Sequence, residues 1–275
     1  TVTLKIGDAL NQVELHIERN NYNAFNNLIN LEEGDFSGIR HTFVQLGFLK
    51  NMKKLRFLDL SNWDVSQIRS LADLLGSRDV NNALTNLQTI KMDNWDVSSV
   101  TSLSGLFSNC KSLLSIDLSS WADKTTNVQN INAFLQGCTA LEEANLEGWD
   151  LPNVTHGAFF AKDCINLKKL NLQGWNFTAQ DNLAEMFMNC ESLEELDLSN
   201  WNISKVGVLM RMFANCYKLK KIDMMNMVNG SRGRPKGYTN QMFLRCWSLE
   251  ELDLSSWDTE GWPNMNAMFY ECYNL

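Results

Sequence analysis

The chain has 275 residues, of which 44% are hydrophobic and 20% are charged, a balance that excludes an intrinsically disordered polymer. Its net charge of −8 argues against nucleic acid as a partner, because binding to a phosphate backbone requires a basic surface. No apolar run approaches the length of a membrane-spanning helix, so we expect no membrane insertion by this segment.

The first 52 residues differ in pattern from the rest of the chain. Apolar and polar residues alternate over residues 1–18, interrupted by a Gly-Asp pair, and this pattern predicts a small β-hairpin. Residues 21–31 and 43–52 resemble an incomplete coil of the repeat that follows. We therefore predict that residues 1–52 form an N-terminal cap with a degenerate first coil.

A repeat of about 26 residues occupies residues 53–275. Its clearest copies are CESLEELDLSNW from Cys190 and CWSLEELDLSSW from Cys246, in which a Trp follows the Cys at a fixed distance. The Trp position is held by Trp63, Trp95, Trp121, Trp149, Trp175, Trp201, Met227 and Trp257, and the Cys position by Cys110, Cys138, Cys164, Cys190, Cys216, Cys246 and Cys272. The L-x-x-L-x-L core of each copy alternates as a short, half-buried strand does.

After each Trp, apolar residues recur at about every third position, which favours a tight helical or 3₁₀ return segment. Variations in repeat length fall in this segment, so one side of each coil is fixed and the other tolerates loops. The sequence therefore predicts an α/β leucine-rich-repeat-like solenoid, with parallel strands on one face and short helical or 3₁₀ return segments on the other. Residues 272–275 begin another copy, so we expect the repeat to continue beyond this truncated end.

The repeated Cys and Trp residues could either pack in the core or form a binding site. The seven cysteines show no C-x-x-C spacing and the three histidines hold no repeated position, so we predict buried, reduced thiols, no metal and no cofactor. The tryptophans could form a carbohydrate-stacking platform. The interpretation we favour is that they point into the core, where each indole N–H requires a backbone acceptor.

Two rows of charged residues lie at outward strand positions. Doublets of alternating sign are expected to face one another on neighbouring strands about 4.8 Å apart, namely Glu142-Glu143, Lys168-Lys169, Glu194-Glu195, Lys220-Lys221 and Glu250-Glu251. The next row includes Asp197, Asp223 and Asp253. A divalent cation could lie between these three carboxylates, but we favour a solvated row that contacts a basic partner.

The candidate binding surface is C-terminal. The position after each Cys becomes aromatic at Tyr217, Trp247 and Tyr273, whereas the repeat does not require an aromatic residue there. The alternative is that these rings pack beneath neighbouring segments. The longest return loop lies nearby in sequence and carries three basic residues, Arg232, Arg234 and Lys236, either as part of the site or as a solvated insertion.

The runs LDLSNWDVS (residues 58–66) and NWDVSSVTSLSGLFSNCKSL (residues 94–113) resemble the repeats of BspA-type leucine-rich-repeat bacterial surface proteins. The positions that carry the resemblance are Leu58, Asp59, Leu60, Trp63, Phe107 and Cys110. This resemblance covers about residues 53–275. It implies a solenoid, display at the cell surface, and a role in adhesion or host interaction.

These observations predict a non-enzymatic protein-interaction or adhesion module, displayed on a microbial cell surface, that binds a protein or another macromolecule. No catalytic Ser/His/Asp set, phosphate-binding glycine loop or HExxH motif is present in the sequence. Two alternatives remain open. One is a structural spacer. The other is a cytoplasmic interaction scaffold, which would suit a chain with many unpaired thiols.

Overall fold

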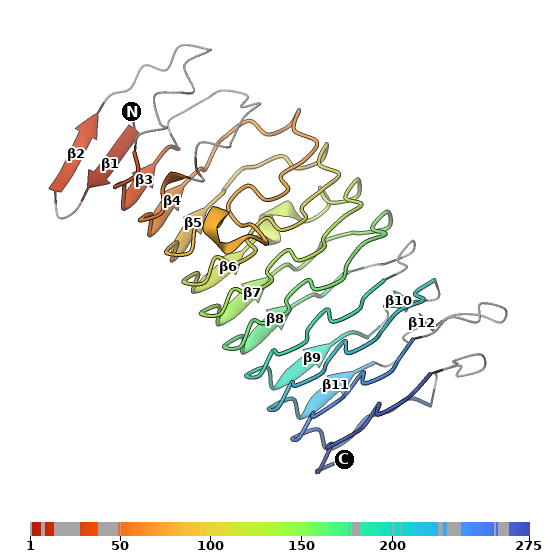
Figure 1. The fold of residues 1–275 in the computed structure, drawn as a ribbon. Helices are drawn as coiled ribbons and strands as arrows, with labels where there is room; N and C mark the ends of the chain where they lie inside the picture. The colour runs from red at the N-terminus through yellow and green to blue at the C-terminus, as the bar shows by residue number, and fades with distance from the viewer. Residues whose placement is uncertain are drawn as a thin grey trace.

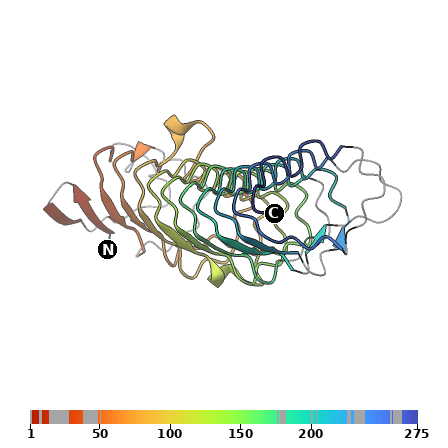
Figure 2. The ribbon, with the colours of Figure 1, turned by 90° about the horizontal axis from the view of Figure 1, so that it is seen from below.

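The computed structural model is an elongated solenoid whose coils stack in chain order (Figure 1). It describes residues 2–6, 9–13, 28–37, 49, 51–175, 177, 182–199, 201–203, 205–224, 228–229, 238–255, 257 and 264–275. The strands run along one long side and the return segments form a second stacked row opposite them (Figure 2). The predicted solenoid with parallel strands on one face is confirmed.

The strands of the long side are short and succeed one another in chain order. They are β1 (Val2–Ile6), β2 (Ala9–Val13), β3 (Glu33–Asp35), β4 (Phe57–Asp59), β5 (Thr89–Lys91), β6 (Ser115–Asp117), β7 (Glu143–Asn145), β8 (Lys169–Asn171), β9 (Glu195–Asp197) and β11 (Lys221–Asp223). Parallel pairing joins β3, β4 and β5, then β6, β7 and β8, then β9 and β11. On another side, β10 (Asn202–Ile203) pairs in parallel with β12 (Val228–Asn229).

The N-terminal end of the sheet is antiparallel. Strands β1 and β2 form the predicted hairpin, with Ile6 opposite Ala9, and β1 also pairs with β3. This arrangement places the hairpin at the end of the row of parallel strands (Figure 1). The division into a cap of residues 1–52 and a repeat domain of residues 53–275 stays a prediction.

The prediction of helical return segments is wrong for most coils. In the described part of the chain the 3₁₀ helices are η3 (Val80–Asn82) and η4 (Ser119–Trp121). Elsewhere the return segments are consecutive turns whose N–H groups reach the next coil, as from Phe107 to the carbonyl of Phe134 at 2.9 Å. Such turns need left-handed residues at intervals, and Gly105 (φ 64°) and Asn109 (φ 60°) supply them.

The repeat tryptophans form a buried stack through the centre of the coils. Neighbouring rings from Trp95 to Trp201 lie 5.8 to 6.0 Å apart and within 13° of parallel. The indole N–H of Trp149 donates to the carbonyl of Leu118 at 3.0 Å, and equivalent bonds hold Trp63, Trp95 and Trp175. The core interpretation is confirmed, although the N–H of Trp121 has no acceptor in the described structure.

The cysteines form a second buried row beside the tryptophans. All seven are free thiols, and all but the half-buried Cys272 are fully buried, which confirms the prediction of reduced core cysteines. The thiol of Cys138, for example, donates to the carbonyl of Phe107 in the preceding coil at 3.1 Å. Burial raises the pKa of Cys110 and Cys216 to about 12, because the thiolate would lose its hydration.

The residue before the core Trp is left-handed in the described coils that carry Asn or Gly there. Asn62 and Asn94 have φ of 65°, and Gly148 and Gly174 have φ of 76° and 87°. Asparagine and glycine tolerate this conformation, which turns the chain inward at the end of each strand. The recurring Asn or Gly before Trp is therefore explained by the turn that brings the indole into the core.

Candidate functional site

The row of residues that follow the cysteines lies on an outer edge of the solenoid. Its side chains face outward, since Lys111 is exposed, Thr139 and Glu191 are half-buried and Ile165 is 36% exposed. The coils do not require an aromatic side chain at this edge, because Lys111, Thr139, Ile165 and Glu191 occupy it in the earlier coils. Aromatic residues at this position therefore need an explanation other than packing of the repeat.

Tyr217 and Trp247 form a stacked aromatic pair at this edge. Their ring centroids are 4.1 Å apart with an angle of 22° between the planes. Trp247 is 41% exposed and Tyr273, one coil further, is 72% exposed, whereas Tyr217 is half-buried. Trp247 does not lie beneath a neighbouring segment, so the alternative of concealed packing does not hold for this ring.

Further exposed aromatic residues, which the sequence analysis did not single out, lie on the return side of the last two coils. Tyr238 is 47% exposed and Tyr270 is 58% exposed. In the same two coils, the guanidinium of Arg245 pairs with the carboxylate of Glu271 at 2.9 Å. Their sequence positions hold varied residues in other coils, so no repeated pattern distinguishes them as surface groups.

The outcome differs for the other two predicted groups, the basic loop residues and the Asp row. The basic residues Arg232, Arg234 and Lys236 lie outside the described residues. Asp197 and Asp253 each accept the backbone N–H of the serine two positions later, at 2.8 Å, and so close the turn at the end of the strand.

This turn explains why Asp occupies the strand end at Asp197 and Asp253, and the explanation needs no bound ligand. Hydrogen bonds from Ser255 hold the pKa of Asp253 below its usual range. In the part of the chain that the structure describes, no three His, Cys, Asp or Glu residues are grouped to hold a metal ion.

The alternating doublets form ion pairs between neighbouring coils. Lys168 pairs with Glu142 at 2.8 Å, and Lys169 with Glu143 at 2.7 Å. The hydrogen bond between Glu194 and Lys220 lowers the pKa of Glu194 and raises that of Lys220. The predicted pairing toward the preceding coil is thus confirmed for Lys168, Lys169 and Lys220, whereas Lys221 forms no ion pair with Glu195 in the described structure. In the described structure, neither Lys168 nor Lys169 pairs with the glutamates of the following coil.

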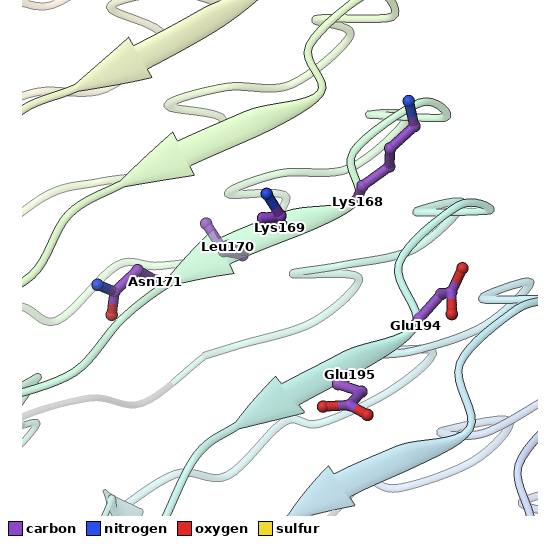
Figure 3. A pocket seen from close by; sticks show the side chains of 6 residues that line it. All are labelled: Lys168, Lys169, Leu170, Asn171, Glu194 and Glu195. Atoms are coloured by element: carbon purple, nitrogen blue, oxygen red, sulfur yellow. The ribbon is translucent and has the colours of Figure 1, made fainter.

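A hollow of about 430 Å³ lies where that pairing is absent. Its walls are β8 (Lys169, Leu170 and Asn171) with the preceding Lys168, and Glu195 of β9 with the preceding Glu194 (Figure 3). Both lips are strand segments, so the hollow is a slot between two neighbouring coils, separate in sequence from the aromatic edge.

Reversing the charge of the Lys168-Lys169 doublet should destabilise the stack. The variant Lys168→Glu plus Lys169→Glu places four carboxylates together with Glu142 and Glu143, and repulsion between them replaces two ion pairs. We expect a lower melting temperature at 10 mM salt and a much smaller difference at 1 M salt, because ions screen exposed charges. Calorimetry at both salt concentrations measures this effect.

The control for this variant is Lys111→Glu plus Lys205→Glu, which changes the net charge equally at exposed lysines outside the ion pairs of the described structure. Equal melting temperatures for the two variants at low salt would show that pairing between coils does not stabilise the solenoid.

Comparison with known proteins identifies a family but no activity. The family model described as "Mycoplasma protein of unknown function, DUF285" matches residues 44–168, 144–231 and 237–275. No match was found among the curated proteins. Within the described residues, no helix has the length and apolar character needed to cross a membrane.

Solved structures similar to this chain include leucine-rich-repeat proteins. A plant peptide hormone receptor, RGFR1 in complex with RGF2, is 18% identical with a TM-score of 0.39, over 83% of this chain and 36% of that chain. An internalin (inlF) from Listeria monocytogenes is 16% identical with a TM-score of 0.33, over 82% and 61%. A leucine-rich repeat protein from Bacteroides ovatus is 16% identical with a TM-score of 0.31, over 85% and 69%. The chain thus spans less than two thirds of the receptor and of the internalin.

Proposed function

Since the chain belongs to the family described as Mycoplasma protein of unknown function, DUF285, we propose its function from its own surface: a non-enzymatic module that binds another protein. The observation that carries this proposal is the outward aromatic edge of Tyr217, Trp247 and Tyr273. The tryptophans of the repeat are buried, whereas Trp247 is 41% exposed and stacked on Tyr217. Exposed aromatic rings of this kind are enriched at the centres of protein interfaces.

The partner that this surface suits is a protein rather than a nucleic acid. Rings presented as a stacked pair offer apolar area at little entropic cost, because neighbouring rings already restrict one another. The acidic balance of the chain, −8 overall, is unfavourable for a phosphate backbone. The strand-end carboxylates of Asp197, Asp223 and Asp253 and the basic residues Arg232, Arg234 and Lys236 are the charged candidates for further contacts with the partner.

Display at a microbial cell surface with a role in adhesion is the finer form of this proposal. It is supported by the resemblance of the repeats to BspA-type surface proteins, carried by positions such as Trp63 and Cys110. A cytoplasmic scaffold is the second candidate, and the seven free thiols favour it, because exported proteins more often oxidise their cysteines. Both candidates use the same aromatic edge.

Removing the exposed rings should weaken binding without unfolding the chain. We expect Trp247→Ser plus Tyr273→Ser to weaken binding by at least about tenfold, the loss of ~1.4 kcal/mol or more that a truncated interface ring causes. Surface plasmon resonance against a panel of purified extracellular-matrix proteins and purified cytoplasmic proteins measures affinity and separates the two candidates. Circular dichroism checks the fold.

The matched control is Ile165→Ser, which changes an exposed apolar side chain at the same position of an earlier coil. We expect this control to keep the wild-type affinity. An unchanged affinity of the double variant for every protein that the wild type binds would refute the placement of the site at the aromatic edge.

A further inference from the structure

Positive charge is concentrated in the two coils that carry Tyr217 and Trp247. Residues 198–249, the basic band, span these coils and contain nine lysines and arginines but one acidic residue, Asp223. The 26 residues before the band and the 26 residues after it each contain six acidic residues and no lysine or arginine. In a chain with a net charge of −8, a positive band thus lies between two negative ones.

Ion pairs with the flanking coils use only part of this positive charge. The pairs are Lys220 with Glu194, Arg245 with Glu271 and Arg211 with Glu185, at 2.8, 2.9 and 3.8 Å. Lys205, Lys218 and Lys221 are exposed and form no ion pair among the described residues. The stacking of the coils therefore does not account for all the cations of the band.

The stacked rings lie inside the basic band. Lys218 follows Tyr217 directly in the chain, and Arg245 precedes Trp247 by two residues. The N–H of Ser248 donates to the carbonyl of Tyr217 at 3.2 Å, so the backbone joins the two coils at this edge. The side chain of Arg245 stays partly exposed although it is ion-paired. The edge therefore presents apolar rings between positive groups.

The width of the band limits how a partner can lie on it. Two coils span about 10 Å along the solenoid axis, because neighbouring parallel strands lie about 4.8 Å apart. A negatively charged partner that ran along the axis would meet Glu191 in the coil before the band and Glu271 in the coil after it. Such a partner must therefore cross the edge around the coils, and only a short segment of it makes contact.

The stacking of the rings favours a peptide over a nucleic acid strand. The ring centroids of Tyr217 and Trp247 are 4.1 Å apart, so the two faces between them are not open to a base. Proteins that bind single strands use free aromatic faces and a basic groove that follows the backbone over several nucleotides. The rings here offer mainly their edges, and the basic band ends at acidic coils on both sides.

We propose that the basic band binds an acidic segment of the partner protein. Carboxylates of the segment pair with Lys218 and Arg245, on either side of the rings that the proposed function assigns to apolar contact. The acidic coils that flank the band repel the segment from neighbouring positions and so fix its placement. This inference rests on the proposed function and names the chemistry of the partner that the aromatic edge receives.

The probe is a blocked eight-residue peptide with a central Leu-Phe pair and glutamates on both sides. Its neutral match carries glutamines in place of the glutamates. By isothermal titration at 50 mM salt we expect saturable binding of the acidic peptide, at least about tenfold tighter than that of the neutral one and weaker at 500 mM salt. An eight-nucleotide strand of thymidine tests the other class of partner, and we expect it not to bind.

Variants of the protein test the charge. Lys218→Glu plus Arg234→Glu should weaken binding of the acidic peptide by at least about tenfold, because two attractions become repulsions. The control Lys111→Glu plus Arg78→Glu makes the same change of charge at exposed residues of earlier coils and should leave the affinity within about twofold. Circular dichroism checks that both variants keep the fold.

The two peptides and Trp247→Ser separate this inference from the proposed function. Equal binding of the acidic and neutral peptides, lost in Trp247→Ser, would overturn the inference alone and leave the aromatic edge in place. Charge-dependent binding that Trp247→Ser does not weaken would overturn the aromatic edge alone. No binding of the acidic peptide, equally tight binding of the thymidine strand, or equal losses in the two charge variants would each overturn the inference.

Discussion

Replacing Trp149 by Ala is expected to lower the free energy of unfolding by about 3 to 5 kcal/mol, the cost of deleting a fully buried aromatic side chain. The ring is fully buried and lies 5.8 Å from Trp121 and 5.9 Å from Trp175, with Phe134 at its edge. Its removal leaves a cavity between coils that cannot close without shortening the stack. It also deprives the carbonyl of Leu118 of its 3.0 Å hydrogen bond.

Urea denaturation followed by circular dichroism measures this loss, and Trp247→Ala is the matched control. Trp247 also stacks on one aromatic ring but is 41% exposed, so its removal leaves no enclosed cavity and should cost less than about 1 kcal/mol. If the two variants were equally stable, the Trp stack would not be the element that holds the coils together.

The sequence was sufficient to predict the solenoid and its core because stacking demands repetition. Each coil covers the next, so the same volume is required at the same position of every coil, and Trp149 and Trp175 recur at a fixed distance for this reason. The opposite signs of Glu142 and Lys168 were readable for the same reason, because parallel strands bring equivalent residues together.

The return segments could not be predicted correctly from apolar spacing alone. An apolar residue at every third position suits a 3₁₀ helix and also a series of turns, since both bury one stripe. The two differ in where the N–H groups point, and here they point to the next coil. The left-handed positions that this needs include Phe159, Gln241 and Arg245, residue types that give no sign of such a conformation.

The aromatic edge and the slot between β8 and β9 also differ in how far the sequence could predict them. The aromatic edge was visible in the sequence because Tyr217 and Trp247 depart from a pattern that requires no aromatic residue there. The slot between β8 and β9 was not visible, because Lys168-Lys169 and Glu194-Glu195 follow the pattern of the neighbouring doublets. Its opening depends on how two regular coils sit against each other, which the spacing of residues does not record.

The row of buried thiols should make the protein unfold sharply in alkaline solution. Burial raises the pKa of Cys110 and Cys216 to about 12, against 9.0 for an ordinary thiol, and raises those of the other cysteines in the row. Below pH 9 the thiols are neutral in both states and have no effect. Between pH 9 and 12 they ionise only in the unfolded chain, so stability falls as pH rises.

Over this range the free energy of unfolding falls by about 1.4 kcal/mol per pH unit for each buried thiol. Near pH 10.5 the six fully buried thiols together cost on the order of 10 kcal/mol, which is comparable with the whole stability of a typical protein. We therefore expect unfolding between about pH 10 and 11, measured by circular dichroism at fixed temperature.

Lysines and tyrosines titrate in the same pH range as the thiols. Comparing how steeply stability falls with pH in the wild type and in Cys variants separates the effect of the thiols from theirs. The variant Cys138→Ala plus Cys190→Ala loses some packing at every pH, but its stability should fall less steeply above pH 9, by about 3 kcal/mol per pH unit relative to the wild type. Cys272→Ala, at the half-buried end of the row, should change the slope much less. Identical slopes for the wild type and the double variant would mean that the thiols ionise inside the folded solenoid, and that the core beside the tryptophans admits water.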